Sequence, residues 1–81
     1  MMGAKQAVAD RLIALCQERG LATHALATLS GVPPMTVYSI LNSKSQNPGI
    51  VTLKKLCDGL EITLGEFFST PEFDSLEQEI K

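Results

Sequence analysis

Residues 23 to 43 contain two short apolar patterns with helical spacing, and Gly31 separates them. Apolar residues three and four apart lie on the same face of a helix. Gly31 can adopt a positive φ without a steric penalty, which suits a sharp turn. The segment therefore predicts two short helices that meet at a tight turn, a helix-turn-helix. Six residues form the two patterns: Leu26, Ala27 and Leu29, then Val37, Ile40 and Leu41.

Length and composition favour one small all-α domain. A chain of 81 residues has room for one hydrophobic core. Hydrophobic residues make up 44% of the chain but aromatic residues only 5%, so we expect an aliphatic core and a helical fold rather than a β-sandwich. No apolar run reaches the roughly 18 residues that a membrane-spanning helix needs, and the amino terminus lacks a signal-peptide pattern. These features predict a cytoplasmic protein with no membrane partner.

The sequence indicates neither metal binding nor catalysis. Cys16 and Cys57 lie far apart, and the single histidine, His24, has no metal-ligand spacing to either of them. Both cysteines fall among apolar residues, so we expect buried, reduced thiols. The chain has no glycine-rich phosphate loop and no paired nucleophile and base. We therefore expect no enzyme activity, no cofactor and no metal.

The distribution of charge favours nucleic acid more than the net charge of −2 suggests. No Asp or Glu occurs between Arg19 and Lys55, and this window spans the whole helix-turn-helix. Four of the nine acidic residues instead lie in the tail, residues 69 to 81. Phosphate binding depends on the local field at one face rather than on the sum over the chain. The acid-free window therefore predicts a face that a DNA backbone can approach.

Further helices are predicted on both sides of the helix-turn-helix. The same periodicity indicates helices over residues 4 to 19 and 50 to 60, and a short helix near residues 64 to 68. Thr63 and Glu66 have the spacing of a capping box, and Gly59 predicts a close contact between helices. Ile13 and Ile50 are expected on the buried faces of their helices. Phe67 and Phe68 either close the core or form part of a dimer seam.

We predict a domain over residues 1 to 68 and an acidic tail over residues 69 to 81. Thr70 and Pro71 can start a short helix in the tail, after which three apolar residues recur at near-helical spacing: Phe73, Leu76 and Ile80. A segment this short is marginal as an isolated helix. It can dock on its own core, pair with a second subunit or remain disordered.

The start of the second predicted helix is a candidate site for a DNA phosphate. Thr23 is expected to be its N-cap, with the hydroxyl accepting a hydrogen bond from a backbone amide. The same amides can bind an anion, so Thr23 and His24 are candidates for a backbone contact. The alternative for His24 is an exposed polar residue without a role.

The third predicted helix carries the candidate base-reading side chains. Pro34 suits the first helical position. Because the apolar residues of this helix face the core, its outer face is left with five others: Met35, Thr36, Tyr38, Ser39 and Asn42. Hydroxyl groups can bond to base edges, Met35 or the Thr36 methyl can contact a thymine methyl, and Asn42 can contact phosphate or adenine. Lys44, in the polar loop that follows, supplies a cation for the DNA backbone.

From about Leu12 to Phe68 the chain resembles the lambda-repressor-like, or Xre/Cro-type, family of helix-turn-helix transcriptional regulators. The ordered series of motifs is more specific than any one of them. The matching residues are Leu26-Ala27 before Gly31-Val32, Thr36-Val37 through Ile40, Asn47-Pro48, Leu53, Leu60, Leu64 and Phe67-Phe68. Glu61 departs from the pattern, since it stands where the family usually has a helix-ending Gly, and we expect a strained or altered corner there.

The resemblance implies a compact bundle of five helices that binds double-stranded DNA, commonly a roughly palindromic operator, as a homodimer. Helix 34 to 42 would enter the major groove. Carried over by position, the base-facing set is Pro34, Met35, Thr36, Tyr38 and Ser39, and the backbone set is Thr23, His24, Asn42 and Lys44. The alternative function is a protein-interaction module, such as an antitoxin, that holds a protein partner through the apolar tail.

Overall fold

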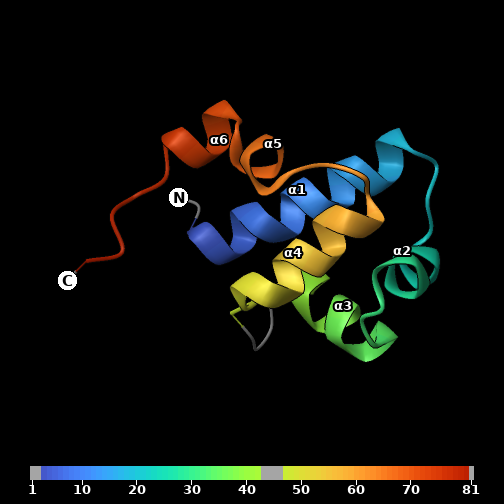
Figure 1. Ribbon diagram of the computed structural model, residues 1–81. Helices are drawn as coiled ribbons and strands as arrows, with labels where there is room; N and C mark the ends of the chain where they lie inside the picture. The colour runs from blue at the N-terminus through green and yellow to red at the C-terminus, as the bar shows by residue number, and fades with distance from the viewer. Residues whose placement is uncertain (1–2, 43–46, 81) are drawn as a thin grey trace.

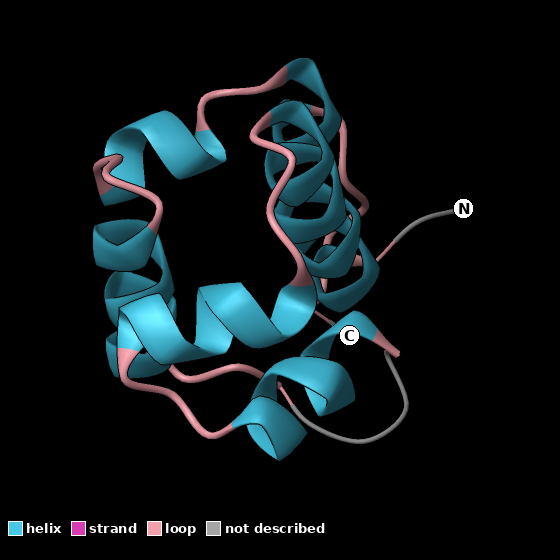
Figure 2. Cartoon of the chain, turned by 90° about the vertical axis from the view of Figure 1, so that its right-hand side faces the viewer, coloured by secondary structure: helices cyan, strands magenta, loops and turns pink. Residues whose placement is uncertain are grey.

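The computed structural model of the chain describes residues 3–42 and 47–80. These residues contain helices and connecting loops and no strand, as Figure 2 shows, which confirms the all-α fold. One short helix is added to the five that were expected. The six helices (Figure 1) are α1 (Ala4–Glu18), α2 (Thr23–Ser30), α3 (Pro34–Leu41), α4 (Ile50–Gly59), α5 (Leu64–Phe68) and α6 (Pro71–Asp74).

One aliphatic core holds the helices together. α2 packs against α3 and α4, α3 also contacts α1, and α5 and α6 lie against α4 and α1 respectively. Phe67 is fully buried, so this aromatic residue closes the core. The thiols of Cys16 and Cys57 are buried in the same core and are not paired with each other, as expected. None of the helices in the described ranges is long and apolar enough to span a membrane.

Three of the helices end in the same left-handed conformation. Gly20, Gly31 and Glu61 have φ angles of 59°, 65° and 59°, and they follow the ends of α1, α2 and α4. Residues with a Cβ rarely adopt this conformation, so Glu61 confirms the unusual corner expected there. In each case the next amide donates to the carbonyl five residues earlier: Leu21 to Cys16, Val32 to Ala27 and Ile62 to Cys57.

The α5 helix is fixed at both of its ends by side chains. Thr63 and Glu66 form the predicted capping box, with bonds of 3.0 Å from the Glu66 amide to the Thr63 hydroxyl and 2.9 Å from the Thr63 amide to the Glu66 carboxylate. At the other end, the Arg11 guanidinium of α1 donates to the Phe67 and Glu66 carbonyls, at 2.8 and 3.0 Å. Arg11 therefore joins α1 to the carboxyl end of α5.

Helices α2 and α4 approach very closely at Gly59, as predicted. A Cβ added at Gly59 would lie 2.2 Å from Ser30 Oγ and 3.2 Å from Ser30 Cα. Only hydrogen therefore fits at position 59. The Ser30 hydroxyl is buried at this contact and has no hydrogen-bond partner within the described part of the chain.

Three apolar side chains that were predicted to be buried are exposed: Ile13, Leu29 and Ile50. In α2 the buried stripe consists of Leu26, Ala27 and Ser30, and Leu29 lies outside it. Ile50 occupies the first turn of α4, before the buried stripe of that helix begins at Leu53. Short helices such as α2 and α4 bury a narrow stripe, so spacing alone assigned Leu29 and Ile50 to the core. Ile13, in the longer α1, is 37% exposed and lies outside the buried residues of that helix.

The tail turns back towards α1. Phe73 packs against Phe67 and Phe68, with ring centroids 6.0 and 4.9 Å apart. Further along, the Glu79 carboxylate accepts a hydrogen bond of 3.3 Å from the Ala4 amide. Ile80 is 85% exposed. Of the three alternatives for the tail, the structure shows docking on the chain's own core through Phe73.

Candidate nucleic-acid interface

The turn between α2 and α3 positions the two helices as a rigid pair. Gly31 ends α2 in the left-handed conformation, and the Val32 side chain that follows is buried in the core. Pro33 is extended, with φ −57° and ψ 137°, and its carbonyl accepts from the Thr36 and Val37 amides in the first turn of α3. Pro34 is at the first helical position, where its missing N–H is not needed. Local backbone preferences therefore fix the turn.

One face of α3 anchors the helix, and the opposite face is open to solvent. Val37 and Ile40 are buried in the core, whereas Met35 and Tyr38 are 78% and 47% exposed. Of the other candidates, Pro34 and Asn42 are exposed, and Thr36 and Ser39 are half-buried at the edges of the face. Among the described residues, no hydrogen bond engages the side chains of Thr36, Tyr38 or Ser39. Their polar groups are free to bond elsewhere.

The amino end of α2 differs from the prediction. Ala22, not Thr23, is the N-cap: Ala22 is extended at φ −72° and ψ 152°, while Thr23 is already the first helical residue. The Thr23 hydroxyl therefore caps no amide, and no other side chain does so. The first amides of α2 remain available to an anion, and His24 beside them is exposed.

The loop after α3 is described only in part. Asn42 directly follows the helix and is exposed. Lys44, the predicted cation for the DNA backbone, lies outside the described residues.

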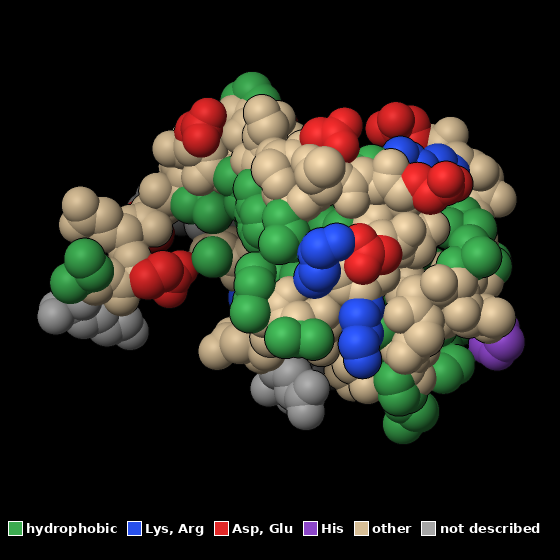
Figure 3. Space-filling view, in the orientation of Figure 1, with side chains coloured by type: hydrophobic (Ala, Val, Ile, Leu, Met, Phe, Trp, Pro, Cys, Tyr) green, Lys and Arg blue, Asp and Glu red, His purple; other side chains and the backbone are tan. Residues whose placement is uncertain are grey.

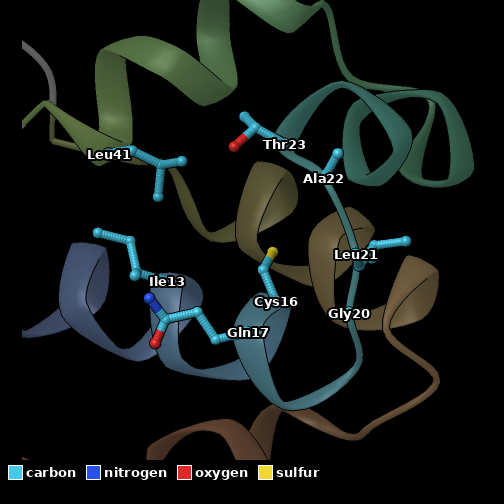
Figure 4. A pocket seen from close by; sticks show the side chains of 8 residues that line it. All are labelled: Ile13, Cys16, Gln17, Gly20, Leu21, Ala22, Thr23 and Leu41. Carbon is cyan, nitrogen blue, oxygen red and sulfur yellow. The ribbon is translucent and has the colours of Figure 1, made fainter.

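A surface hollow of about 420 Å³ lies where α1, the start of α2 and the end of α3 meet. Figure 4 shows Cys16 and Gln17 of α1 on one side of it, Thr23 on another and Leu41 opposite them. Burial raises the pKa of the Cys16 thiol, and the charge of Arg19 opposes this to a lesser degree. The thiol is therefore protonated at neutral pH and is a poor nucleophile.

Gln17 is a polar residue of this region that the sequence did not single out. It is exposed and lines the same hollow as Thr23. The sequence could have indicated this position of Gln17, because the last turn of α1 is separated from α2 by only a short left-handed turn at Gly20. Side chains of that last turn must therefore lie beside the start of α2.

The described acidic residues lie outside the two helices of the helix-turn-helix. The described Asp and Glu residues lie on α1, at the end of α4 and from there to the tail, and none lies on α2 or α3. In Figure 3 acidic side chains lie along the upper edge of the visible face, and others lie over the tail and beside the basic side chains over α4. Within the described ranges, no three His, Cys, Asp or Glu side chains are grouped to hold a metal ion. The two helices therefore present no acidic side chain to an approaching molecule.

The comparisons with known proteins agree with this geometry. The family model of the Cro/C1-type HTH DNA-binding domain matches residues 11–72. The structure of prophage Lp1 protein 11 superposes with a TM-score of 0.82 at 29% identity, over 94% of this chain and 100% of that one. No match was found among curated proteins.

A second solved structure is an HTH_3 family transcriptional regulator from Vibrio cholerae, with a TM-score of 0.74 and 37% identity. The match covers 80% of this chain but only 36% of that longer protein. Both structures have the fold found here, and the family model spans the helix-turn-helix, the capping box and the start of α6. The chain belongs to the Cro/C1-type helix-turn-helix family of DNA-binding domains.

Proposed function

We propose that this DNA-binding domain regulates transcription by binding a roughly palindromic operator as a homodimer, with α3 in the major groove. The observation that carries the proposal is the outer face of α3. It exposes Met35 and Tyr38, bears no charge, and belongs to a helix pair without acidic residues. A B-DNA major groove admits an α-helix and presents a distinct pattern of donors and acceptors for each base pair.

In this proposal one set of side chains contacts the DNA bases and another contacts the DNA backbone. Pro34, Met35, Thr36, Tyr38 and Ser39 face the bases, where hydroxyls bond to base edges and the Met35 side chain contacts thymine methyls. The backbone set is Thr23, His24, Asn42 and Lys44. The uncapped amides at the start of α2 support the Thr23 and His24 contacts, since an anion is their natural partner.

An uncharged reading face has a consequence for affinity. Phosphate contacts supply most of the sequence-independent free energy of DNA binding. Lys44 is the only Lys or Arg between Arg19 and Lys54 in the sequence, so one domain neutralises few phosphates. We therefore propose modest affinity for a single half-site and a need for two subunits on one operator.

Selection of bound duplexes from a random pool, followed by gel-shift titration, tests the function. We expect a roughly palindromic consensus and an affinity that falls as salt rises. Thr36→Ala and Tyr38→Ala should alter the selected sequence, whereas Lys44→Ala should weaken binding to all duplexes alike. Gln78→Ala, in the exposed tail, is the control. Absence of any duplex binding at low salt would refute the proposal.

The tail does not favour the alternative of a protein-interaction module. That reading needs Phe73, Leu76 and Ile80 to present one apolar surface to a partner. Phe73 is packed on the chain's own core and Leu76 is half-buried, so of these three side chains only Ile80 is exposed to solvent. We therefore propose DNA binding alone.

A further inference from the structure

The amino half of α3 presents an apolar surface to solvent. Pro33 and Pro34 are exposed, and Met35 is 78% exposed. Tyr38 lies three and four positions after Met35 and Pro34, on the same face of the helix, and is 47% exposed. Because Val37 holds the opposite face in the core, this surface points away from the body of the domain. In Figure 3 hydrophobic side chains project at the lower edge of the molecule, at the position of α3 in Figure 1.

The same surface lacks the groups that recognise bases through paired hydrogen bonds. Helix α3 contains no Arg, Lys, Asn, Gln, Asp or Glu, the side chains that pair with guanine, adenine or cytosine. The backbone offers little in their place. Pro34 has no N–H, and the Thr36 and Val37 amides donate to the Pro33 carbonyl. Apolar contact, with single hydroxyl groups beside it, is the means of recognition that remains.

Thymine is the one base of unmodified DNA that presents an apolar group in the major groove, the methyl group on C5. We infer that Met35 recognises this methyl group itself, so that 5-methylcytosine replaces thymine at the base pairs that Met35 contacts. The inference rests on the proposed function, which places α3 in the major groove. Methylation of a cytosine at C5 would then create a binding site on a sequence that is otherwise rejected.

The chemistry of the Met35 side chain limits what it can distinguish. Methionine is unbranched and adapts its shape to a small apolar group. It has no hydrogen-bond donor, and its thioether is only a weak acceptor. It therefore cannot separate the O4 oxygen of thymine from the N4 amino group of cytosine, and only the methyl group changes the contact. At such a position thymine and 5-methylcytosine should bind alike, and uracil and cytosine should both bind more weakly.

The size of the effect follows from the area that one methyl group buries. Burial of one methyl group should change the dissociation constant roughly fourfold. A two-fold operator contains each position twice, so removal of both symmetry-related methyl groups should weaken binding roughly 15-fold. A gel-shift titration resolves a change of this size.

A comparison of four pyrimidines tests the inference on the duplex selected from a random pool. Each thymine of the half-site is replaced in turn, symmetrically, by uracil, 5-methylcytosine and cytosine, with the paired purine changed to match. Uracil removes the methyl group and keeps the O4 oxygen, whereas 5-methylcytosine keeps the methyl group and loses that oxygen. We expect at least one position where 5-methylcytosine binds like thymine and uracil binds like cytosine.

Two variants assign the effect to one side chain. Met35→Ala should abolish the difference between thymine and uracil at that position. Leu29→Ala is the matched control, because it truncates another exposed aliphatic side chain, 61% exposed on α2, and should leave the difference unchanged. Both residues are exposed, and circular dichroism melts verify that each variant is folded.

Several outcomes would overturn the inference. Equal affinity for thymine and uracil at every position would show that no methyl group is recognised, as would a selected half-site without thymine. A position where 5-methylcytosine binds as weakly as cytosine would assign recognition to the O4 oxygen, if no other position behaved as expected. A thymine preference that survives Met35→Ala would assign it to another side chain.

The same titrations separate this inference from the proposed function. A chain that binds its selected duplex but is indifferent to the methyl groups keeps the proposed function and loses the inference. A chain that binds no duplex at low salt overturns both.

Discussion

Gly59→Ala is the substitution whose effect the packing determines most directly. The new methyl group would lie 2.2 Å from the Ser30 hydroxyl and 3.2 Å from Ser30 Cα and Cβ. The hydroxyl can rotate, but the Cα belongs to the backbone of α2 and can retreat only if the helix moves. The added methyl therefore pushes α2 away from α4.

The expected magnitude follows from two opposed effects. Overpacking a well-packed contact costs about 1–3 kcal/mol. Ala favours a helix over Gly by up to about 1 kcal/mol, less here because position 59 is the last residue of α4. The net loss of folding free energy should be about 1–2 kcal/mol. For a domain of this size that lowers the melting temperature by roughly 5–15 °C.

A double-mutant cycle in urea or thermal unfolding is the decisive measurement. Ser30→Ala removes a buried hydroxyl that has no partner among the described residues, so alone it should stabilise by up to about 1 kcal/mol. Because it also removes the closest contact, the pair Ser30→Ala with Gly59→Ala should be at least about 1 kcal/mol more stable than the sum of the single effects.

Gly65→Ala is the matched control for this cycle. Gly65 is also helical, but a methyl group there meets only Thr63 Oγ1, at an ordinary 3.7 Å. We expect it to be neutral or stabilising, by up to about 1 kcal/mol. If Gly59→Ala behaved like Gly65→Ala, or if the double mutant were strictly additive, the reasoning from the close approach would be wrong.

Three other changes have defined outcomes. Glu61→Gly should stabilise by about 1 kcal/mol in urea unfolding, because it removes a Cβ from a φ of 59°. Arg11→Met should lower stability by about 1–2 kcal/mol, since the Glu66 and Phe67 carbonyls lose a charged donor, while Arg11→Lys should recover only part of this. Burial, with the Asp58 charge, raises the pKa of the Cys57 thiol. The contribution of this thiol to the free energy of unfolding should be fully present below about pH 8.5, and it should decrease as the pH rises towards the raised pKa of the folded state. Thermal unfolding measured from pH 7 to 10 would show this decrease.

The sequence predicted the fold where local chemistry is specific. The glycine at 31, the Pro34 start and the capping box each depend on backbone preferences of a few residues, and all three are present in the structure. The close approach at Gly59 was also predictable, since glycine destabilises a helix relative to Ala, and a close contact between helices is one reason for glycine to occur there.

Predictions that depended on tertiary packing were less accurate. Leu29 and Ile50 have helical spacing, but which sectors of α2 and α4 are buried is decided by the helices beside them. The assignment of the N-cap to Thr23 rather than Ala22 was wrong for a different reason. Thr is the better capping residue, but the backbone becomes helical one residue earlier than expected. Side-chain capping preferences alone do not predict this boundary.

The placement of the proposed base-reading face of α3 depends on contacts that lie away from it. α2 is fixed against α4 at the contact of Ser30 with Gly59, and α3 is fixed by the left-handed turn at Gly31 and by Val37 in the core. Met35 and Tyr38 take part in neither contact, so they can change without disturbing the fold. A larger side chain at position 59 would instead move α2 and the turn together. Substitutions on the exposed face of α3 should therefore alter which sequence is bound, and substitutions at the contact of α2 with α4 should lower affinity for every sequence.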